Sequence, residues 1–293
     1  MEFNSDNTIV YTVLIGQNEG LNSQPFIRNS KLRHVCLTDD ENLYSDDWEI
    51  LHIKPLLPMD PYRSQRNLKI RPHLIFPEYN YSFYFDNTVV LKCSVEKLIN
   101  KLFSDQIYDM KNPFLILPYN SLRDNLIAEF FECFVCNLDS EIRFFEQISD
   151  YLKIDRLALK LKPYWAAMLL RNHMHPNLIE FSEIWFSNIL RYSRRDQLSI
   201  IYAGLQSDCM IKGIEVDNHY SDYHDWPITK NERKFRFNEN NLNEFSDFFE
   251  KLLTQFSLSD QEILKIDFNK QIEETKLKYA FNKVKKMEKF FTK

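Results

Sequence analysis

Carboxylates follow two apolar segments in the first third of the chain. Asp39 and Asp40 come directly after RHVCLT, and Asp86 ends YSFYFD. Both segments have the apolar, aromatic or β-branched composition of buried strands. Ligands of open α/β sheets bind beyond the carboxyl ends of the strands, where such carboxylates can hold Mg²⁺ or Mn²⁺. For Asp39 and Asp40, an ordinary turn pair explains the residues equally well.

Cations recur at helical spacing between these two positions. Arg63, Arg66 and Lys69 are three residues apart, so on a helix they share one broad face. No acidic i,i+4 partner stands among these three cations. Cations without such a partner are suited to binding phosphate oxygens. A solvated basic face is the alternative interpretation.

A second polar group lies in the segment SRRDQLS. Ser193 and Asp196 have the spacing of a capping box, which alone would explain both residues. Arg194 and Arg195 would stand in the first turn of that helix, where positive charge opposes the helix dipole. We therefore expect these arginines to meet an anion or an acidic partner.

The elements that must position these residues alternate along the first half of the chain. Apolar runs predict strands over residues 8–15, 33–38, 48–53, 81–86, 113–118 and 167–171. Cap and periodicity signals predict helices over residues 62–70, 94–103, 121–152, 176–192 and 193–206. For the first of these, Asp60 is the expected N-cap and Pro61 the first helical position. Alternating strands and helices predict an α/β fold with a mainly parallel sheet covered on both faces.

Composition changes after residue 205 suggest the domain organisation. We expect residues 1–205 to form the α/β domain, residues 206–240 to pack on it as an irregular segment, and residues 241–293 to form a helical extension. Flexible linkers rich in Gly, Ser or Pro are absent from the sequence.

The segment 270–293 has the pattern of an interfacial helix. It holds eight Lys against three Glu, and its apolar residues recur at helical spacing. This pattern predicts docking on an anionic membrane surface or on a partner that carries the acceptor. Packing of the apolar stripe against the α/β domain is the alternative.

Bulk composition excludes several classes of protein. A net charge of -5 offers no general attraction for nucleic acid, and four Gly exclude Gly-rich phosphate loops. Five Cys, an odd number in mostly apolar runs, indicate reduced thiols in a cytoplasmic protein. The C-x-x-C pair Cys133 and Cys136 lies within a helical run, so core packing explains it better than a metal or redox site.

Taken together, the motifs resemble a known family. It is the glycosyltransferase-like family associated with plant mucilage and cell-wall proteins, which has bacterial members. The matching segments are VYTVLIG (10–16), CLTD (36–39), the Arg63, Arg66 and Lys69 helix, PHLIFPEY (72–79), DNT (86–88), and Arg171, His173, Trp185 and SRRDQLS (193–199). The resemblance covers residues 9 to 205 and departs from the family pattern at Thr88, where an acidic or amide residue is expected.

This resemblance implies a GT-A-like fold and transfer of a sugar from a nucleotide-sugar donor to a glycan or lipid-linked acceptor, in surface polysaccharide synthesis. It implies that Asp86 binds Mg²⁺ or Mn²⁺ and that Asp196 activates the acceptor or recognises the sugar. It also implies that Asp39 binds the nucleoside of the donor. The diphosphate is expected to bind at the helix residues Arg63, Arg66 and Lys69. Further donor contacts are expected of His173, Arg195 and Gln197.

Two other functions fit the same residues. One is a non-catalytic sugar- or nucleotide-binding protein that kept the fold, which the departure at Thr88 would suit. The other is a metal-dependent phosphohydrolase that uses the same carboxylates. Hydrolysis of a nucleotide-sugar without acceptor favours the phosphohydrolase, whereas binding without turnover favours the non-catalytic protein.

Overall fold

A computed structural model describes residues 3–16, 19–103, 114–207, 209–229, 240–255 and 273. The chain divides into two compact units. Unit 1 comprises residues 1–122 and 162–234, and unit 2 comprises residues 123–161 and 235–293. The sequence-based division differs, because it assigned residues 123–161 to the same domain as the strands.

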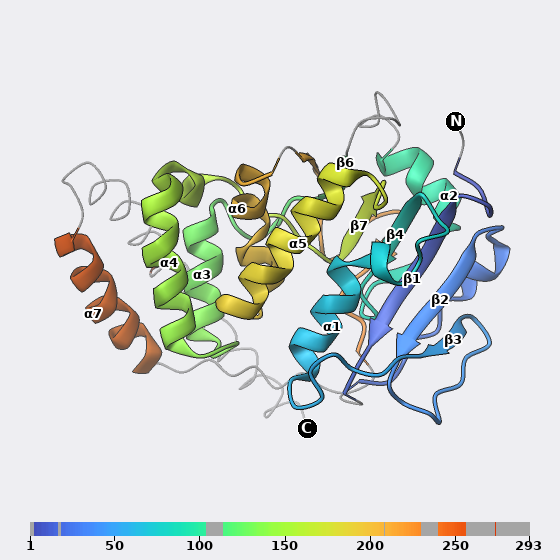
Figure 1. Ribbon diagram of the computed structural model, residues 1–293, viewed down its shortest axis with the longest axis horizontal. Coiled ribbons are helices and arrows are strands. Elements are labelled where there is room, and N and C mark those ends of the chain that lie inside the picture. The colour runs from blue at the N-terminus through green and yellow to red at the C-terminus, as the bar shows by residue number, and fades with distance from the viewer. Residues whose placement is uncertain are drawn as a thin grey trace, which may run out of the picture. The chain divides into compact units, whose positions relative to one another are not determined.

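The described part of unit 1 is built on a seven-stranded sheet in the order β3-β2-β1-β4-β7-β6-β8 (Figure 1). Its strands are β1 (Thr8–Leu14), β2 (Arg33–Thr38), β3 (Glu49–His52), β4 (Tyr81–Phe85), β6 (Phe114–Pro118), β7 (Met168–Arg171) and β8 (Met210–Ile214). A second, two-stranded sheet pairs β5 (Val90–Leu91) with β9 (His224–Asp225). The predicted α/β class is confirmed.

Strand direction divides the large sheet. Strands β3, β2, β1 and β4 are parallel neighbours, β6 is parallel to β8, and β7 is antiparallel to both β4 and β6. The sheet is therefore mainly parallel, as predicted. After β1 the chain moves outward through β2 and β3, then returns to place β4 on the other side of β1. The point where the order reverses lies between β1 and β4, and ligands of open α/β sheets bind at such a switch point.

Helices cover both faces of the sheet, as alternating side chains require. Val10, Cys36 and Phe83 point to one face and pack in a core that includes residues of α2. Tyr11 and Tyr84 point to the other face, where residues of α1 and α5 pack. The helices of unit 1 are α1 (Pro61–Ile70), α2 (Val95–Leu98) with a π-helical continuation (Ile99–Phe103), α5 (Pro176–Arg191) and α6 (Ile200–Leu205).

Helix α1 begins where the cap signals predict. The Asp60 carboxylate accepts a hydrogen bond from the Arg63 backbone N–H at 3.0 Å, and Pro61 occupies the first helical position. By contrast, the capping box that offered an alternative explanation of Ser193 and Asp196 is not formed. The Ser193 hydroxyl accepts from the Arg195 N–H at 3.2 Å, and Asp196 begins a short 3-10 helix, Asp196–Leu198.

The sheet also contains a strand that the sequence did not predict. Strand β8 lies within residues 206–240, which were expected to be irregular, and it pairs with β6 along the edge. Between β6 and β7, residues 123–161 belong to unit 2, and the segments on either side of them pair with each other. There the Asn120 N–H donates to Pro163 O at 2.8 Å, the Trp165 N–H donates to Pro118 O at 2.7 Å, and the Tyr119 and Tyr164 rings stack.

Unit 2 is helical where the structure describes it. Its helices are α3 (Leu126–Val135), α4 (Glu141–Asp155) and α7 (Asn240–Gln255). Aromatic residues hold these helices together, since the Phe134 ring lies 5.2 Å from Phe145 and 5.0 Å from Phe245 between ring centroids. Cys133 and Cys136 are buried free thiols.

The predicted interfacial segment 270–293 lies outside the described residues, apart from Glu273. Its docking on a membrane or partner stays a prediction. Among the helices that the structure describes, none combines the length and the apolar character that crossing a bilayer requires.

Candidate active site

Two loops at the switch point carry the predicted carboxylates. The Gly16 backbone N–H, directly beyond β1, donates to the Asp39 carboxylate at 2.9 and 3.2 Å. Gly16 has φ 90°, a left-handed conformation that favours glycine. Asp86 follows β4 directly, and its own N–H donates to Ala167 O at 2.9 Å. Because β1, β2 and β4 are parallel, their carboxyl ends place both carboxylates at the same edge of the sheet.

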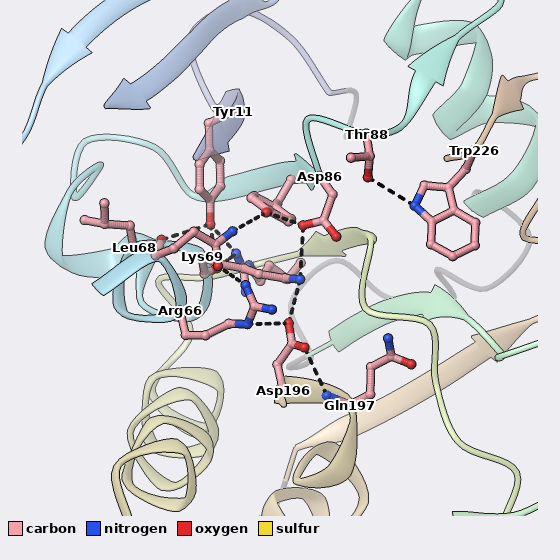
Figure 2. Close-up of polar contacts among 12 residues, drawn as sticks. Tyr11, Arg66, Leu68, Lys69, Asp86, Thr88, Asp196, Gln197 and Trp226 are labelled. Carbon is pink, nitrogen blue, oxygen red and sulfur yellow. Dashed lines mark hydrogen bonds and ion pairs between the residues drawn. The ribbon is translucent and has the colours of Figure 1, made fainter. Parts of the chain in front are cut away.

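Helix α1 delivers two cations to Asp86 and Asp196. The Lys69 ammonium lies 3.3 Å from Asp86 Oδ1 and 2.6 Å from Asp196 Oδ2. Arg66 Nε lies 3.3 Å from the same Asp196 oxygen. Figure 2 shows Lys69 between the two carboxylates, with Arg66 beside Asp196. The i,i+3 spacing predicted a shared helix face, and the structure brings these two residues together. We call Arg66, Lys69, Asp86 and Asp196 the charged cluster.

Asp196 forms the buried end of the charged cluster. Its side chain is 3% exposed, and its backbone carbonyl accepts a hydrogen bond from the Trp185 indole N–H of α5 at 3.0 Å. Burial alone would raise the pKa of its carboxyl group, but Arg66, Lys69 and Arg195 outweigh burial and hold the pKa well below its ordinary value. Asp196 is therefore a permanent anion and a weak base.

Asp86 forms the more accessible end. Its side chain is 31% exposed. The Tyr84 hydroxyl donates to Asp86 Oδ1 and in turn accepts from Gln65 Nε2 at 3.0 Å. Burial and the neighbouring Asp86 charge raise the pKa of Tyr84 well above its ordinary value, so the hydroxyl keeps its proton. Together, Tyr84 and Lys69 fix Oδ1, which leaves Oδ2 available to a ligand.

A buried arginine, Arg171, fixes the backbone that carries Lys69 of the charged cluster. Arg171, in β7, donates to the Lys69 carbonyl at 2.6 Å and to the Ser82 hydroxyl at 3.1 Å, and it also donates to the Tyr11 hydroxyl. Tyr11 donates to the same Lys69 carbonyl at 2.7 Å. Two donors therefore satisfy a carbonyl in the last turn of α1 and fix the backbone of Lys69. Within the part of the chain that the structure describes, Arg171 contacts no carboxylate.

Sequence reasoning did not select Tyr11, Tyr84 or Gln65 as site residues, and it noted Arg171 only through the family resemblance. Two signals mark them in the sequence. Tyr84 and Asp86 are two residues apart in a predicted strand, so their side chains lie on the same face. Arg171 ends an otherwise apolar run, and a buried arginine requires partners.

Two of the predicted donor-binding residues, Arg63 and His173, make their polar contacts elsewhere. The Arg63 guanidinium bonds the Asp60 carboxylate at 2.7 Å and the carbonyls of Ile189 and Tyr192 at 2.8 Å each, so it ties α1 to the end of α5. His173 is buried, and its Nε2 lies 3.1 Å from the Phe76 carbonyl. Burial lowers the pKa of His173 to about 3, so its imidazole is neutral.

Gln197 and Arg195 flank Asp196. The Gln197 N–H donates to Asp196 Oδ1 at 3.2 Å, and the Gln197 side-chain carbonyl accepts from Asn120 at 3.3 Å. Arg195 adds positive charge beside Asp196, which agrees with the expected acidic partner. Arg194 lies over the Tyr62 ring at 4.1 Å. The donor-binding roles of Arg63, His173, Arg195 and Gln197 stay predictions, as does the nucleoside contact of Asp39.

Asp86 is the one carboxylate of the DNT triplet, and its role as a ligand of Mg²⁺ or Mn²⁺ stays a prediction. Within the described ranges, no three His, Cys, Asp or Glu side chains are grouped so that they could hold a metal ion. Thr88, the third residue of the DNT triplet, has its hydroxyl occupied by the Trp226 indole N–H at 3.1 Å. The Lys69 ammonium lies 3.3 Å from Asp86 Oδ1, so the carboxylate already has a cationic partner at that oxygen.

Comparison with known proteins gives distant matches only. Neither a protein-family model nor a curated protein matches the chain. Among solved structures, the apo structure of the WbbM bifunctional glycosyltransferase aligns with 9% identity and a TM-score of 0.44, over 72% of this chain and 40% of that chain. The apo form of mouse xyloside xylosyltransferase 1 aligns with 10% identity and a TM-score of 0.43, over 71% and 84%. These values are too low to establish a shared fold or to transfer an activity.

Proposed function

We propose that the chain is a GT-A-like glycosyltransferase, which moves a sugar from a nucleotide-sugar donor to a glycan or lipid-linked acceptor. The observation that carries the proposal is the charged cluster at the switch point of the sheet, where Lys69 lies between Asp86 and Asp196. The motif resemblance over residues 9–205 also supports it, because three of its segments contribute the four residues of the charged cluster: the helix with Arg66 and Lys69, DNT (86–88) and SRRDQLS (193–199).

The cations suit the departure of a diphosphate. Sugar transfer breaks the bond between the anomeric carbon and a phosphate oxygen, so negative charge grows on the leaving group while positive charge grows on the sugar. Arg66 is 15% exposed and lies one helical turn from Lys69. Fixed cations at a helix-covered site stabilise such charge more than they would in water.

In the proposed reaction, an acceptor hydroxyl oxygen forms a bond to the anomeric carbon. The bond from that carbon to the diphosphate breaks, and the nucleoside diphosphate leaves with the bonding electron pair. The acceptor proton passes to Asp86, because this carboxylate combines partial exposure with an orientation held by Tyr84 and Lys69.

Asp196 takes a different role from the catalytic one expected from sequence. Its carboxylate is buried, and Arg66 and Lys69 hold it as an anion. A carboxylate of such low basicity is poorly suited to accept a proton near neutral pH. We assign it as a positioning residue that orients the two cations toward the donor.

The test uses the full chain and a panel of uridine, guanosine, cytidine, adenosine and thymidine diphosphate sugars. We expect one nucleoside series to raise the melting temperature and the matching donor to release nucleoside diphosphate faster when acceptor glycans are added. Arg66→Gln should weaken both effects. Arg33→Gln is the matched control, because Arg33 lies at the opposite end of β2 and pairs with Glu49.

Other outcomes distinguish the alternatives. Stabilisation by a nucleotide-sugar without turnover supports a non-catalytic binding protein. Rapid hydrolysis that acceptors do not change supports a phosphohydrolase. Absence of any response to all five series contradicts nucleotide-sugar binding altogether. The cytoplasmic location and the role in surface polysaccharide synthesis stay predictions from sequence.

A further inference from the structure

The Lys69 ammonium stands beside Asp86 Oδ1 and would repel a divalent cation bound at Oδ2 of the same carboxylate. Its side chain is 2% exposed and lies between two carboxylate oxygens, at 3.3 Å from Asp86 Oδ1 and 2.6 Å from Asp196 Oδ2 (Figure 2). The Lys69 carbonyl accepts hydrogen bonds from the Tyr11 hydroxyl and from the Arg171 guanidinium. Backbone and ammonium are therefore both fixed in place.

The rest of the DNT triplet offers a cation no ligand. The Asn87 side-chain carbonyl accepts from the Asn22 N–H at 2.8 Å, and its amide donates to Gly20 O at 3.0 Å. The Thr88 hydroxyl accepts from Trp226 at 3.1 Å. Both residues are buried. Of the three residues, Asp86 alone presents a free oxygen, and Mg²⁺ or Mn²⁺ on that oxygen would stand within a few ångströms of an ammonium of the same sign.

Positive charge exceeds negative charge around this point without a metal. Arg66, Lys69, Arg171 and Arg195 contribute four cations, against the two carboxylates of the cluster, Asp86 and Asp196. Asp196 is shared by Arg66 and Lys69, and Arg171 bonds only neutral oxygens among the described residues. An excess of fixed, desolvated positive charge at a ligand-binding edge is complementary to an anion.

We propose that Arg66 and Lys69 bind the donor diphosphate directly, so that nucleoside diphosphate binding requires no divalent cation. This inference rests on the proposed function. It assigns Lys69 the charge that a metal supplies elsewhere, and it leaves Asp86 as a carboxylate that faces the reacting hydroxyl rather than a metal ligand. With no divalent cation to bridge them, Asp86 and a bound diphosphate repel each other.

Isothermal titration calorimetry tests the inference with the full chain and five probes: UDP, GDP, CDP, ADP and TDP. Each is titrated in buffer with excess EDTA and in buffer with excess MnCl₂. We expect one nucleoside diphosphate to bind with dissociation constants that differ by less than about threefold between the two buffers, a difference below one charge-assisted hydrogen bond. A dependence on Mn²⁺ of about tenfold or more overturns the inference and leaves the proposed function intact.

Asp86→Asn separates the two modes of binding most sharply. Removal of its negative charge should leave diphosphate binding unchanged or tighter if fixed cations hold the ligand, whereas a metal-ligand role predicts that binding is lost. Arg66→Gln should weaken binding about tenfold in both buffers, since one charge-assisted contact is removed. Unchanged binding by Arg66→Gln overturns the assignment of Arg66.

Two further variants complete the design. Lys69→Met should abolish binding, and a thermal melt shows whether it folds; Arg66→Gln carries the test if it does not, because Arg66 is more exposed. Arg33→Gln removes a guanidinium at the amino end of β2, away from the charged cluster, so this variant should bind nucleoside diphosphate like wild type. If none of the five probes binds in either buffer, the proposed function fails together with this inference.

Discussion

Strands β4 and β8 are each followed directly by a carboxylate that contacts a lysine, yet the two environments differ. Asp86 lies 3.3 Å from Lys69, whose side chain is 2% exposed. Glu215 lies 2.9 Å from Lys162, and these side chains are 70% and 35% exposed. Water screens the second pair, so it contributes little, whereas the first belongs to a desolvated group of charges. Burial and neighbours, rather than residue type, make one strand end a candidate site.

The largest expected effect concerns activity at these two carboxylates. Asp86→Asn should lower sugar transfer by about a hundredfold or more, because it removes the proposed proton acceptor, while the melting temperature changes little. Glu215→Gln should change neither. Release of nucleoside diphosphate in the presence of acceptor measures both variants. Activity of Asp86→Asn within a few fold of wild type would remove Asp86 from the reaction.

Stability should show the next effect. Asp196→Asn leaves Arg66 and Lys69 without their buried counter-ion, so we expect it to lower the free energy of unfolding by about 3–5 kcal/mol. Urea denaturation followed by circular dichroism measures the loss. Glu215→Gln, which breaks an exposed pair, should cost less than about 1 kcal/mol. Equal losses for both variants would show that the buried cluster is no stronger than a surface ion pair.

The same carboxylate predicts a dependence on pH. The pKa of Asp196 is lower in the folded chain than its ordinary value of about 3.9. Its contribution to stability is therefore complete above that value and is lost as the pH falls toward the folded pKa. Between about pH 5 and about pH 2, wild type should lose more stability than Asp196→Asn. Parallel curves for the two proteins would contradict the depressed pKa.

The smallest effect lies in the β8 half of the sheet. A Cβ added at Gly213 would stand 2.0 Å from the Tyr119 ring, so the ring stacked on Tyr164 must move. Gly213→Ala should cost about 1–3 kcal/mol in unfolding free energy and leave activity per folded molecule unchanged, the reverse of Asp86→Asn.

Gly204→Ala is the matched control for that substitution. Its added Cβ would meet the Ile211 side chain, with the flexible terminal Cδ1 at 2.6 Å and Cγ1 at 3.6 Å. Alanine is also favoured over glycine within α6. Urea denaturation should show a clear loss for Gly213→Ala alone. A loss of similar size for both variants would mean that Tyr119 is not held in place.

The sequence predicted the parallel half of the fold well, because buried strands and capped helices leave local signals. The bounds of β2 and the start of α1 were predicted correctly. Strand β8 was not predicted, since MIKGI is half-exposed, contains Lys212 and Gly213, and is a strand only through its long-range pairing with β6. The antiparallel direction of β7 likewise depends on tertiary packing.

Only part of the charged cluster could be predicted. Helical spacing predicted that Arg66 and Lys69 share a face, but the same spacing included Arg63, which packs against α5 instead. No periodicity indicates that Asp196 lies against α1, because more than a hundred residues separate them. The capping-box interpretation of Asp196 failed for the same reason: a local pattern cannot show a distant partner.

The contacts that close the chain between β6 and β7 have a consequence for how the molecule can change over evolution. Residues 121–162 leave and return through neighbouring strand ends, clamped by the Asn120 to Pro163 and Trp165 to Pro118 hydrogen bonds. Any insert whose ends meet at that clamp satisfies the sheet, and the entropy of closing a longer loop grows only slowly with its length. A change in the length of this segment therefore costs the sheet little, whereas α7 depends on the sequence of the segment, because Phe245 packs against Phe134 of α3.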